Sequence, residues 1–194
     1  NSVALTAGGI RGAMGTSDGV VTIWNLPSAD KTFTIVDSNS SGRNPSRINL
    51  KVAFSPDGSR VACATPHGSV KVYDSATGQQ LTSFDKHIRQ VQCLAFSPDG
   101  RVIASGGRPH PLQLWNSETG EELQTINRTD IQSICFSGDE ATLLTGAFNG
   151  TLRAWDIESI TETLTLMGHR GHVRDLTFDS EGTRIASAGH DGTL

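Results

Sequence analysis

Short apolar runs alternate with turn residues along most of the chain. In residues 112–115, apolar and polar side chains alternate with a period of two, which is typical of a β-strand with one buried face. Ser-Pro-Asp-Gly and Glu-Thr-Gly segments separate such runs and favour tight turns. Within one stretch the pattern predicts four short strands, at residues 91–96, 102–105, 112–115 and 122–126.

The same pattern repeats. Phe54-Ser55-Pro56-Asp57-Gly58 recurs at Phe96–Gly100, with weaker copies at Phe136–Asp139 and Phe178–Gly182, so the phenylalanines are 42, 40 and 42 residues apart. An aromatic residue follows 19 positions after the first three of these phenylalanines, and Leu5 stands 19 positions before Trp24. A period of this length predicts an array of similar β-units. The near-helical spacing of Ile157, Ile160 and Leu164 falls in a turn and a fourth strand of this register.

A repeat with four strands, a Gly168-His169 start and a Trp155-Asp156 end resembles the WD-repeat β-propeller family, in the regular form found in bacterial multidomain proteins. The resemblance implies an all-β arc of about 4.5 four-stranded antiparallel blades, part of a seven-bladed propeller. It divides the single propeller region 1–194 into three complete repeats between two partial ones: 1–36 (partial), 48–84, 87–126, 127–167 and 168–194 (partial).

In this family a His, a Ser or Thr, an Asp and a Trp form a hydrogen-bonded tetrad inside each blade. The resemblance implies structural roles of this kind, in place of catalytic ones, for these residues: His87, Ser105, Trp115, Asn127, Thr145, Asn149, Trp155, His169, Ser187, Asp191, Asp18 and Trp24. The repeat at 87–126 carries Pro109 where Asp is expected, and the repeat at 48–84 lacks a tetrad because Cys63 and Tyr73 stand at two of its positions.

Composition excludes several classes of protein. Sixteen Lys and Arg against twenty Asp and Glu give a net charge of −4, which argues against nucleic-acid binding. No apolar run reaches the roughly 20 residues of a membrane span. The N-terminus shows no signal-peptide pattern, and the three cysteines fit small buried side chains in a reducing compartment, so we expect a cytoplasmic protein.

Other chemistry is weakly supported by the sequence. His169, His172 and His190 would need further ligands to hold a metal, and no carboxylate pair stands out as a general acid and base. We therefore expect no metal, no cofactor and no catalytic residue. A hydrolase or lyase that uses the central channel is the enzymatic alternative.

Loops between blades, and between second and third strands, share one face of a propeller. There we expect a partner surface that prefers an acidic or phosphorylated peptide, because Arg favours bidentate contacts to such groups; ordinary solvated charge is the alternative. The candidate residues are Arg89, Arg108, His110, Arg128, Arg170, His172, Arg43 and Arg47. The Ser/Asn-rich segment 37–47 is either a loop that contacts a partner or an insertion that is tolerated without a function.

Two functions remain open. The first is a non-catalytic scaffold for protein or peptide partners. The second is a sensory or regulatory propeller of a larger enzyme, such as a bacterial serine/threonine kinase, and it rests on family analogy alone. An isolated arc would expose apolar faces at both ends, so we also expect it to oligomerise.

Overall fold

The computed structural model describes residues 2–16, 19–36, 50–65, 67–179 and 181–194. Eighteen strands and no helix are formed within these residues. They make five antiparallel sheets, here called blades 1 to 5, and within each sheet every strand pairs with the strand that precedes it in the chain. The all-β propeller architecture predicted from the repeat is confirmed.

Blade 1 consists of β1 (Ser2–Leu5), β2 (Arg11–Gly15), β3 (Val20–Asn25) and β4 (Asp30–Val36). Blade 2 consists of β5 (Val52–Phe54), β6 (Arg60–Ala64), β7 (Val70–Asp74) and β8 (Gln80–Phe84). Blade 3 consists of β9 (Cys93–Phe96), β10 (Val102–Gly106), β11 (Leu112–Asn116) and β12 (Glu122–Ile126). Blade 4 consists of β13 (Ile131–Phe136), β14 (Thr142–Ala147), β15 (Thr151–Asp156) and β16 (Thr161–Met167). Blade 5 has two described strands, β17 (Val173–Phe178) and β18 (Ile185–Gly189).

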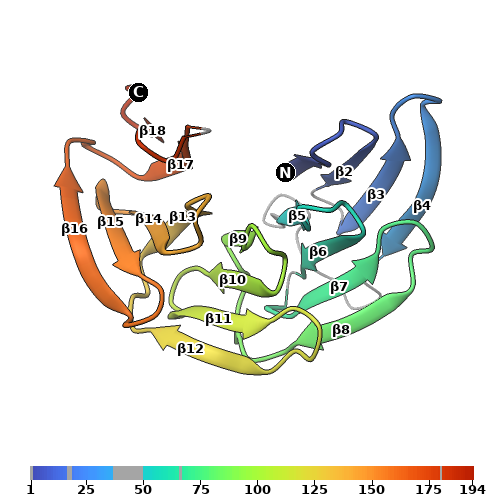
Figure 1. The fold of residues 1–194 in the computed structure, drawn as a ribbon, viewed down its shortest axis with the longest axis horizontal. Coiled ribbons are helices and arrows are strands. Elements are labelled where there is room, and N and C mark those ends of the chain that lie inside the picture. Colours follow the sequence, from blue (N-terminus) through green and yellow to red (C-terminus); the bar gives the residue numbers. More distant parts are fainter. Residues whose placement is uncertain (1, 17–18, 37–49, 66, 180) are drawn as a thin grey trace.

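The blades follow one another around an open arc, with the first strand of each blade innermost and the fourth on the outside (Figure 1). Both ends of the chain lie beside the gap in this arc. One expectation needs correction: residues 1–36, expected to be a partial repeat, contain a full four-stranded blade. Leu5 replaces the repeat's Phe at the end of β1, and an apolar residue there is sufficient for the strand to pair with β2.

The Ser-Pro-Asp-Gly turns are fixed by their own side chains. In blade 3, Ser97 Oγ donates to Asp99 Oδ1 over 2.6 Å and accepts the N–H of Val102 over 2.9 Å. Gly100 has a φ of 75°, in the left-handed region that glycine enters without a steric penalty. In blade 2 the matching hydroxyl of Ser55 holds the pKa of Asp57 at about 2.

The hydrophobic core lies between blades. Val70, Val72 and Phe84 of blade 2 pack in one cluster with residues of blade 3 that include Ile103 and Trp115. The rings of Phe84 and Trp115 stack with centroids 5.1 Å apart. Each blade therefore depends on its neighbours for burial, as expected for a repeat array.

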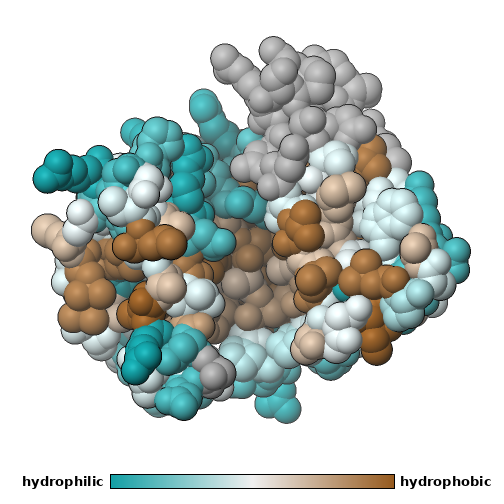
Figure 2. Space-filling model, turned by 90° about the horizontal axis from the view of Figure 1, so that it is seen from above, coloured by the Kyte–Doolittle hydropathy of each residue, from teal (hydrophilic) through white to brown (hydrophobic). Residues whose placement is uncertain are grey.

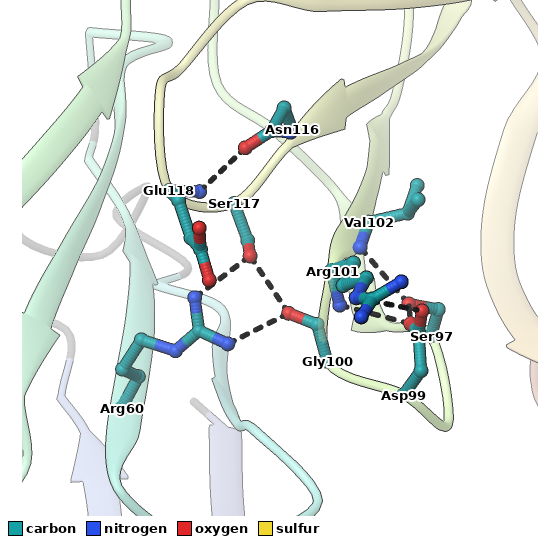
Figure 3. Close-up of polar contacts among 9 residues, drawn as sticks. All are labelled: Arg60, Ser97, Asp99, Gly100, Arg101, Val102, Asn116, Ser117 and Glu118. Carbon is teal, nitrogen blue, oxygen red and sulfur yellow. Dashed lines mark hydrogen bonds and ion pairs between the residues drawn. The ribbon is translucent and has the colours of Figure 1, made fainter.

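Polar contacts also join neighbouring blades at the ends of their second strands. Arg60 of β6 donates to Ser117 Oγ over 2.8 Å and to Gly100 O over 2.9 Å, both in blade 3 (Figure 3). Arg11 of β2 makes the same kind of contact to Ser75 Oγ in blade 2, over 2.6 Å. These bonds hold β2 and β6 against the turn region of the next blade.

Candidate functional site

The tetrad residues of blade 3 lie in one buried chain. Trp115 Nε1 donates to Ser105 Oγ over 3.1 Å, and Ser105 Oγ lies 2.8 Å from His87 Nε2. Because Pro109 offers no carboxylate, His87 Nδ1 is buried without a hydrogen-bond partner. Burial, followed by the neighbouring His110, lowers the pKa of His87 to about 4. Ser105 is fully buried, so the chain holds strands together and is closed to substrate.

Blade 5 contains a different part of the tetrad, namely the His, the hydroxyl and the carboxylate. His169 Nε2 lies 2.9 Å from Ser187 Oγ, and His169 Nδ1 lies 3.2 Å from Asp191 Oδ1. Asp191 also accepts the backbone N–H of Arg170 over 2.6 Å, and this bond is the main reason that its pKa lies far below the usual range. The carboxylate thus ties the loop before β17 to the turn after β18.

The other blades keep less of the tetrad. In blade 4, Trp155 Nε1 donates to Thr145 Oγ1 over 3.0 Å. Asn149 accepts the N–H of its neighbour Thr151, and no described residue forms a hydrogen bond with Asn127. In blade 1, Trp24 lies on β3 across from Gly12, and Asp18 lies outside the described residues.

A cavity of about 220 Å³ lies where the innermost strands of the five blades converge. Its wall is made by the residues at the starts of these first strands: Ser2, Val3, Lys51, Val52, Gln92, Cys93, Leu94, Gln132, Ser133, Ile134, Arg174 and Asp175. The loops that join successive blades lead directly into these strand starts. The cavity therefore opens on the face predicted for partner binding, and we call it the channel-mouth cavity.

Several polar groups of this cavity are unpaired. Gln132 is only 8 % exposed, and its side chain forms no hydrogen bond with any described residue. The Oε1 atom of Gln92 is likewise buried without a partner. Lys51 and Arg174 form no ion pair with any carboxylate of the described chain. The amide of Gln132 and the two cations thus line the cavity without a described protein partner, so this wall is suited to a ligand that accepts hydrogen bonds.

An aromatic and basic cluster lies on the same face, over blades 3 to 5. The guanidinium of Arg108 lies 5.7 Å from the centre of the Phe148 ring. The Phe148 and His172 rings are 4.5 Å apart, and those of His172 and His190 are 5.6 Å apart. Desolvation first, and then the charges of Arg174, His190 and Arg108, lower the pKa of His172. His172 directly precedes β17, and Arg174 and Asp175 of that strand line the channel-mouth cavity, so the cluster adjoins the cavity.

The structure places the predicted partner residues in several different environments. Arg108 and His172 meet in the aromatic cluster, whereas Arg89 and Arg170 are exposed elsewhere on the loops of this face. His110 is only 4 % exposed because it packs against the ring of His87, 5.4 Å away, so it offers no surface to a partner. Arg43 and Arg47 lie outside the described residues, with the segment 37–47.

Arg128 belongs to a different environment. It donates to Glu162 over 3.1 Å and lies over the Trp155 ring, 5.9 Å from its centre. Arg153 lies 3.6 Å from the same carboxylate. Glu162 therefore neutralises much of the charge that Arg128 was expected to offer to an anionic partner.

Sequence reasoning missed most of the channel-mouth residues. Gln92, Gln132 and Arg174 each stand four positions before the repeat's Phe, and Lys51 stands three before it. Equal positions in successive repeats face the same axis of a propeller, so the repeat register itself was the signal. The loops drew attention because of their arginines, whereas the glutamines carried no obvious chemistry.

Metal and thiol chemistry find little support in this geometry. Across residues 2–16, 19–36, 50–65, 67–179 and 181–194, no group of three His, Cys, Asp or Glu is placed to hold a metal ion. Burial raises the pKa of the Cys63 and Cys93 thiols to about 12, which suppresses the reactive thiolate. The described part of the chain contains no helix that is long and apolar enough to cross a membrane.

Comparison with protein families identifies WD repeats. The family described as "WD domain, G-beta repeat" matches residues 46–74, 78–110, 120–156 and 160–194, which is more than half of the chain. The last three matches begin just before an outer strand, β8, β12 or β16, and continue into the next blade. The sequence repeat is thus offset by one strand from the structural blade.

Three curated relatives show the range of proteins in which similar repeats occur. Periodic tryptophan protein 2 of Saccharomyces cerevisiae is 41 % identical over 147 residues, which is 74 % of this chain and 16 % of the relative. Eukaryotic translation initiation factor 3 subunit I of Culex quinquefasciatus is 32 % identical over 66 residues, or 34 % of this chain and 20 % of the relative. WD repeat and SOCS box-containing protein 1 of Xenopus tropicalis is 43 % identical over 60 residues, or 30 % of this chain and 14 % of the relative. The chain thus spans a fifth or less of the length of these relatives.

Proposed function

The chain belongs to the WD-repeat family, and on that premise we propose that it is a non-catalytic scaffold that binds a protein or peptide partner. The binding surface is the channel-mouth face. It comprises the aromatic cluster of Arg108, Phe148, His172 and His190 and the adjoining channel-mouth cavity.

One observation carries this proposal: a polar cavity with unpaired side chains adjoins an aromatic cluster on a face built from loops. Aromatic and Arg side chains are the residues that most often dominate binding energy in protein interfaces. Loops held by a rigid scaffold are the usual place for such contacts. Here the scaffold is rigid because each blade packs against its neighbours, as the shared cluster of blades 2 and 3 illustrates.

The partner segment is acidic or phosphorylated. Arg108, Arg170 and Arg174 contribute positive charge to this face, and Lys51 adds an ammonium group at the cavity wall. Asp175 is the opposing carboxylate of the wall. The resulting local excess of cations favours an anionic segment over a neutral or basic one, although the chain as a whole carries a net charge of −4.

A scaffold is favoured over an enzyme because the His–Ser pair of blade 3 is sealed inside the blade. The relatives reported above are eukaryotic proteins, and their names give no support to a bacterial origin or to a propeller attached to a kinase.

The three cysteines are free thiols, which suits a reducing compartment, and we propose that the protein acts in the cytoplasm.

A displayed library of random peptides tests the function, with the full 194-residue chain as bait. We expect enriched peptides to carry Asp or Glu, and we expect their affinity to fall at least tenfold in Arg108→Ala and in Phe148→Ala. Lys31→Ala changes an exposed cation on the outer strand β4 and serves as the matched control. Absence of any enriched sequence, or equal binding by all variants, would contradict the proposed surface.

A further inference from the structure

We propose that the channel-mouth cavity is a carboxylate-binding pocket that receives an Asp or Glu side chain of the bound peptide. This inference rests on the proposed function and adds to it the chemical identity of one anchoring group. The cavity is bounded by the starts of the innermost strands, and three of its side chains supply the recognition: Lys51, Gln132 and Arg174.

The charge of the wall selects a single negative charge. Lys51 and Arg174 supply two cations, and Asp175 supplies one anion, so the formal charge of the wall is +1. Asp175 accepts the backbone N–H of Leu176 over 3.0 Å. A carboxylate balances this wall, whereas a phosphate dianion would leave an excess negative charge close to the Asp175 oxygens.

One amide group of the wall can donate to a ligand. Gln132 is 8 % exposed, lines the cavity and forms no hydrogen bond with a described residue, so its N–H groups are available to water or to a ligand in the cavity. A carboxylate is an acceptor with two oxygens, and it can take an N–H from Gln132 together with one from Lys51 or Arg174. Hydrogen bonds to an ionised acceptor are about twice as strong as neutral ones, which favours the ligand over water alone.

The wall is fixed before a ligand arrives. Ser133 Oγ donates to Val173 O over 3.1 Å, which joins blade 4 to blade 5 beside the cavity. A Cβ atom on Gly107 would lie 2.9 Å from the backbone N of Gln92, and one on Gly146 would lie 2.5 Å from Ser133 Oγ. The two glycines thus permit close packing behind the wall, and a preorganised wall loses less entropy on binding.

The cavity also has the right size. Its volume of about 220 Å³ is several times the roughly 30 Å³ that one water occupies in the liquid. A carboxylate with the one or two methylene groups of Asp or Glu therefore fits, and the apolar atoms of Val52 and Leu94 in the wall can contact those methylenes.

The test is a titration of the ¹⁵N-labelled 194-residue chain with blocked pentapeptides Ser-Gly-X-Gly-Ser, in which X is Glu, Gln or phosphoserine. The side-chain amide resonances of Gln92 and Gln132 report the pocket directly. We expect the Glu peptide to shift both resonances and the Gln peptide to shift neither. The double variant Lys51→Gln and Arg174→Gln should weaken binding at least tenfold. Lys31→Gln with Arg184→Gln removes two exposed cations on other surfaces and should leave binding unchanged.

Gln132→Met keeps the length of the side chain and removes its N–H groups, and it should weaken binding of the Glu peptide without changing the folded spectrum. Four outcomes would overturn the pocket: no shift with the Glu peptide, equal binding by the double variant, tighter binding of the phosphoserine peptide, or binding of free acetate as tight as that of the peptide. The double variant could still bind library-selected peptides that Arg108→Ala no longer binds. That result would support the proposed function and disprove the carboxylate pocket.

Discussion

The guanidinium of Arg60 in blade 2 donates to the hydroxyl of Ser117 in blade 3 over 2.8 Å, and both groups bind the carbonyl of Gly100. Arg11 and Ser75 form the same pair one blade earlier. The next equivalent positions carry Val102 and Ile157, which belong to one apolar cluster between blades 3 and 4. The two members of the pair thus change from polar to apolar together, as direct contact across a blade interface requires.

Loss of the Arg60 contact should weaken the interface of blades 2 and 3. Arg60→Met keeps an aliphatic side chain and removes both donors, and we expect the free energy of unfolding to fall by about 1–2 kcal/mol. Urea unfolding followed by circular dichroism measures this change. A double-mutant cycle with Ser117→Ala should give a coupling energy of about 1 kcal/mol.

Arg101→Met is the control for this cycle. The Arg101 side chain is 79 % exposed and lies 3.8 Å from Asp99, so its loss should cost less than about 0.5 kcal/mol. Additive effects of the Arg60 and Ser117 substitutions would show that the bond across the blades contributes nothing to stability.

The buried hydroxyls at equivalent positions should differ in importance because they have different partners. Ser105→Ala orphans both His87 Nε2 and Trp115 Nε1, and we expect it to cost about 2–4 kcal/mol. Thr145→Val orphans Trp155 Nε1, removes a long bond of 3.4 Å to the carbonyl of Arg153, and keeps the shape of the side chain, so about 1–3 kcal/mol is expected.

Thermal or urea unfolding of both variants gives this ranking. Ser187→Ala in blade 5 is the reference, because Ser187 is partly exposed and its described partner is His169 alone. A larger loss in Thr145→Val than in Ser105→Ala would show that packing, and not hydrogen bonding, dominates at these positions.

The repeat made the strands predictable. The predicted fourth strand 122–126 coincides with β12. The Glu-Thr-Gly turn before it and the strand pattern of the repeat defined where this strand begins and ends. Blade 1 was harder to predict, because Leu5 and Met14 replace the landmark Phe and hydroxyl of other repeats. Its strands nevertheless pair in full register, since backbone hydrogen bonding depends on extended conformation and not on those two side chains.

The site could be predicted only in part. Arg108 and His172 stood out as charged loop residues, whereas Phe148 looked like an ordinary apolar residue. Arg108, Phe148 and His172 lie on loops of different blades. They come into contact only because the blades pack side by side. The burial of His110 and the pairing of Arg128 with Glu162 are likewise tertiary effects that no local pattern contains.

Acid should destabilise the protein through His87. Its pKa in the folded state is about 4, against an ordinary value of 6.5, so the folded state binds fewer protons than the unfolded state between these pH values. The stability that comes from a neutral His87 is fully present above pH 6.5 and is lost as the pH falls through 4. The total loss approaches about 3 kcal/mol.

His87→Gln isolates this effect, because Gln can still bond to Ser105 but does not titrate. Urea unfolding midpoints between pH 7 and pH 4.5 should fall less steeply in His87→Gln than in the wild-type chain. His67→Gln serves as the control because His67 does not belong to the His87–Ser105–Trp115 chain. Parallel pH profiles for the wild-type chain and His87→Gln would contradict the assignment.

The two ends of the arc should drive self-association. Viewed from the side of the gap, the molecule carries apolar surface at both ends of the arc (Figure 2). Blade 1 exposes Val3 to 70 % and Leu5 to 60 %, and Met167 at the other end is 82 % exposed. Apolar patches larger than a few hundred Å² are rare on soluble monomers, so sedimentation of the 194-residue chain should show species larger than a monomer as concentration rises.

Charge placed on one end tests whether the ends are responsible. Leu5 and Leu26 both lie against Gly12, where a Cβ atom would meet each side chain at 3.4 Å, so they form one patch on blade 1. Leu5→Lys with Leu26→Lys should therefore shift sedimentation toward the monomer. Leu81→Lys is the control. It changes an exposed leucine on the outer strand β8, away from both ends of the arc, and should leave association unchanged. A wild-type chain that stays monomeric at every concentration would show that the end faces are adequately solvated, because their exposed apolar area would then be too small to offset the entropy of association.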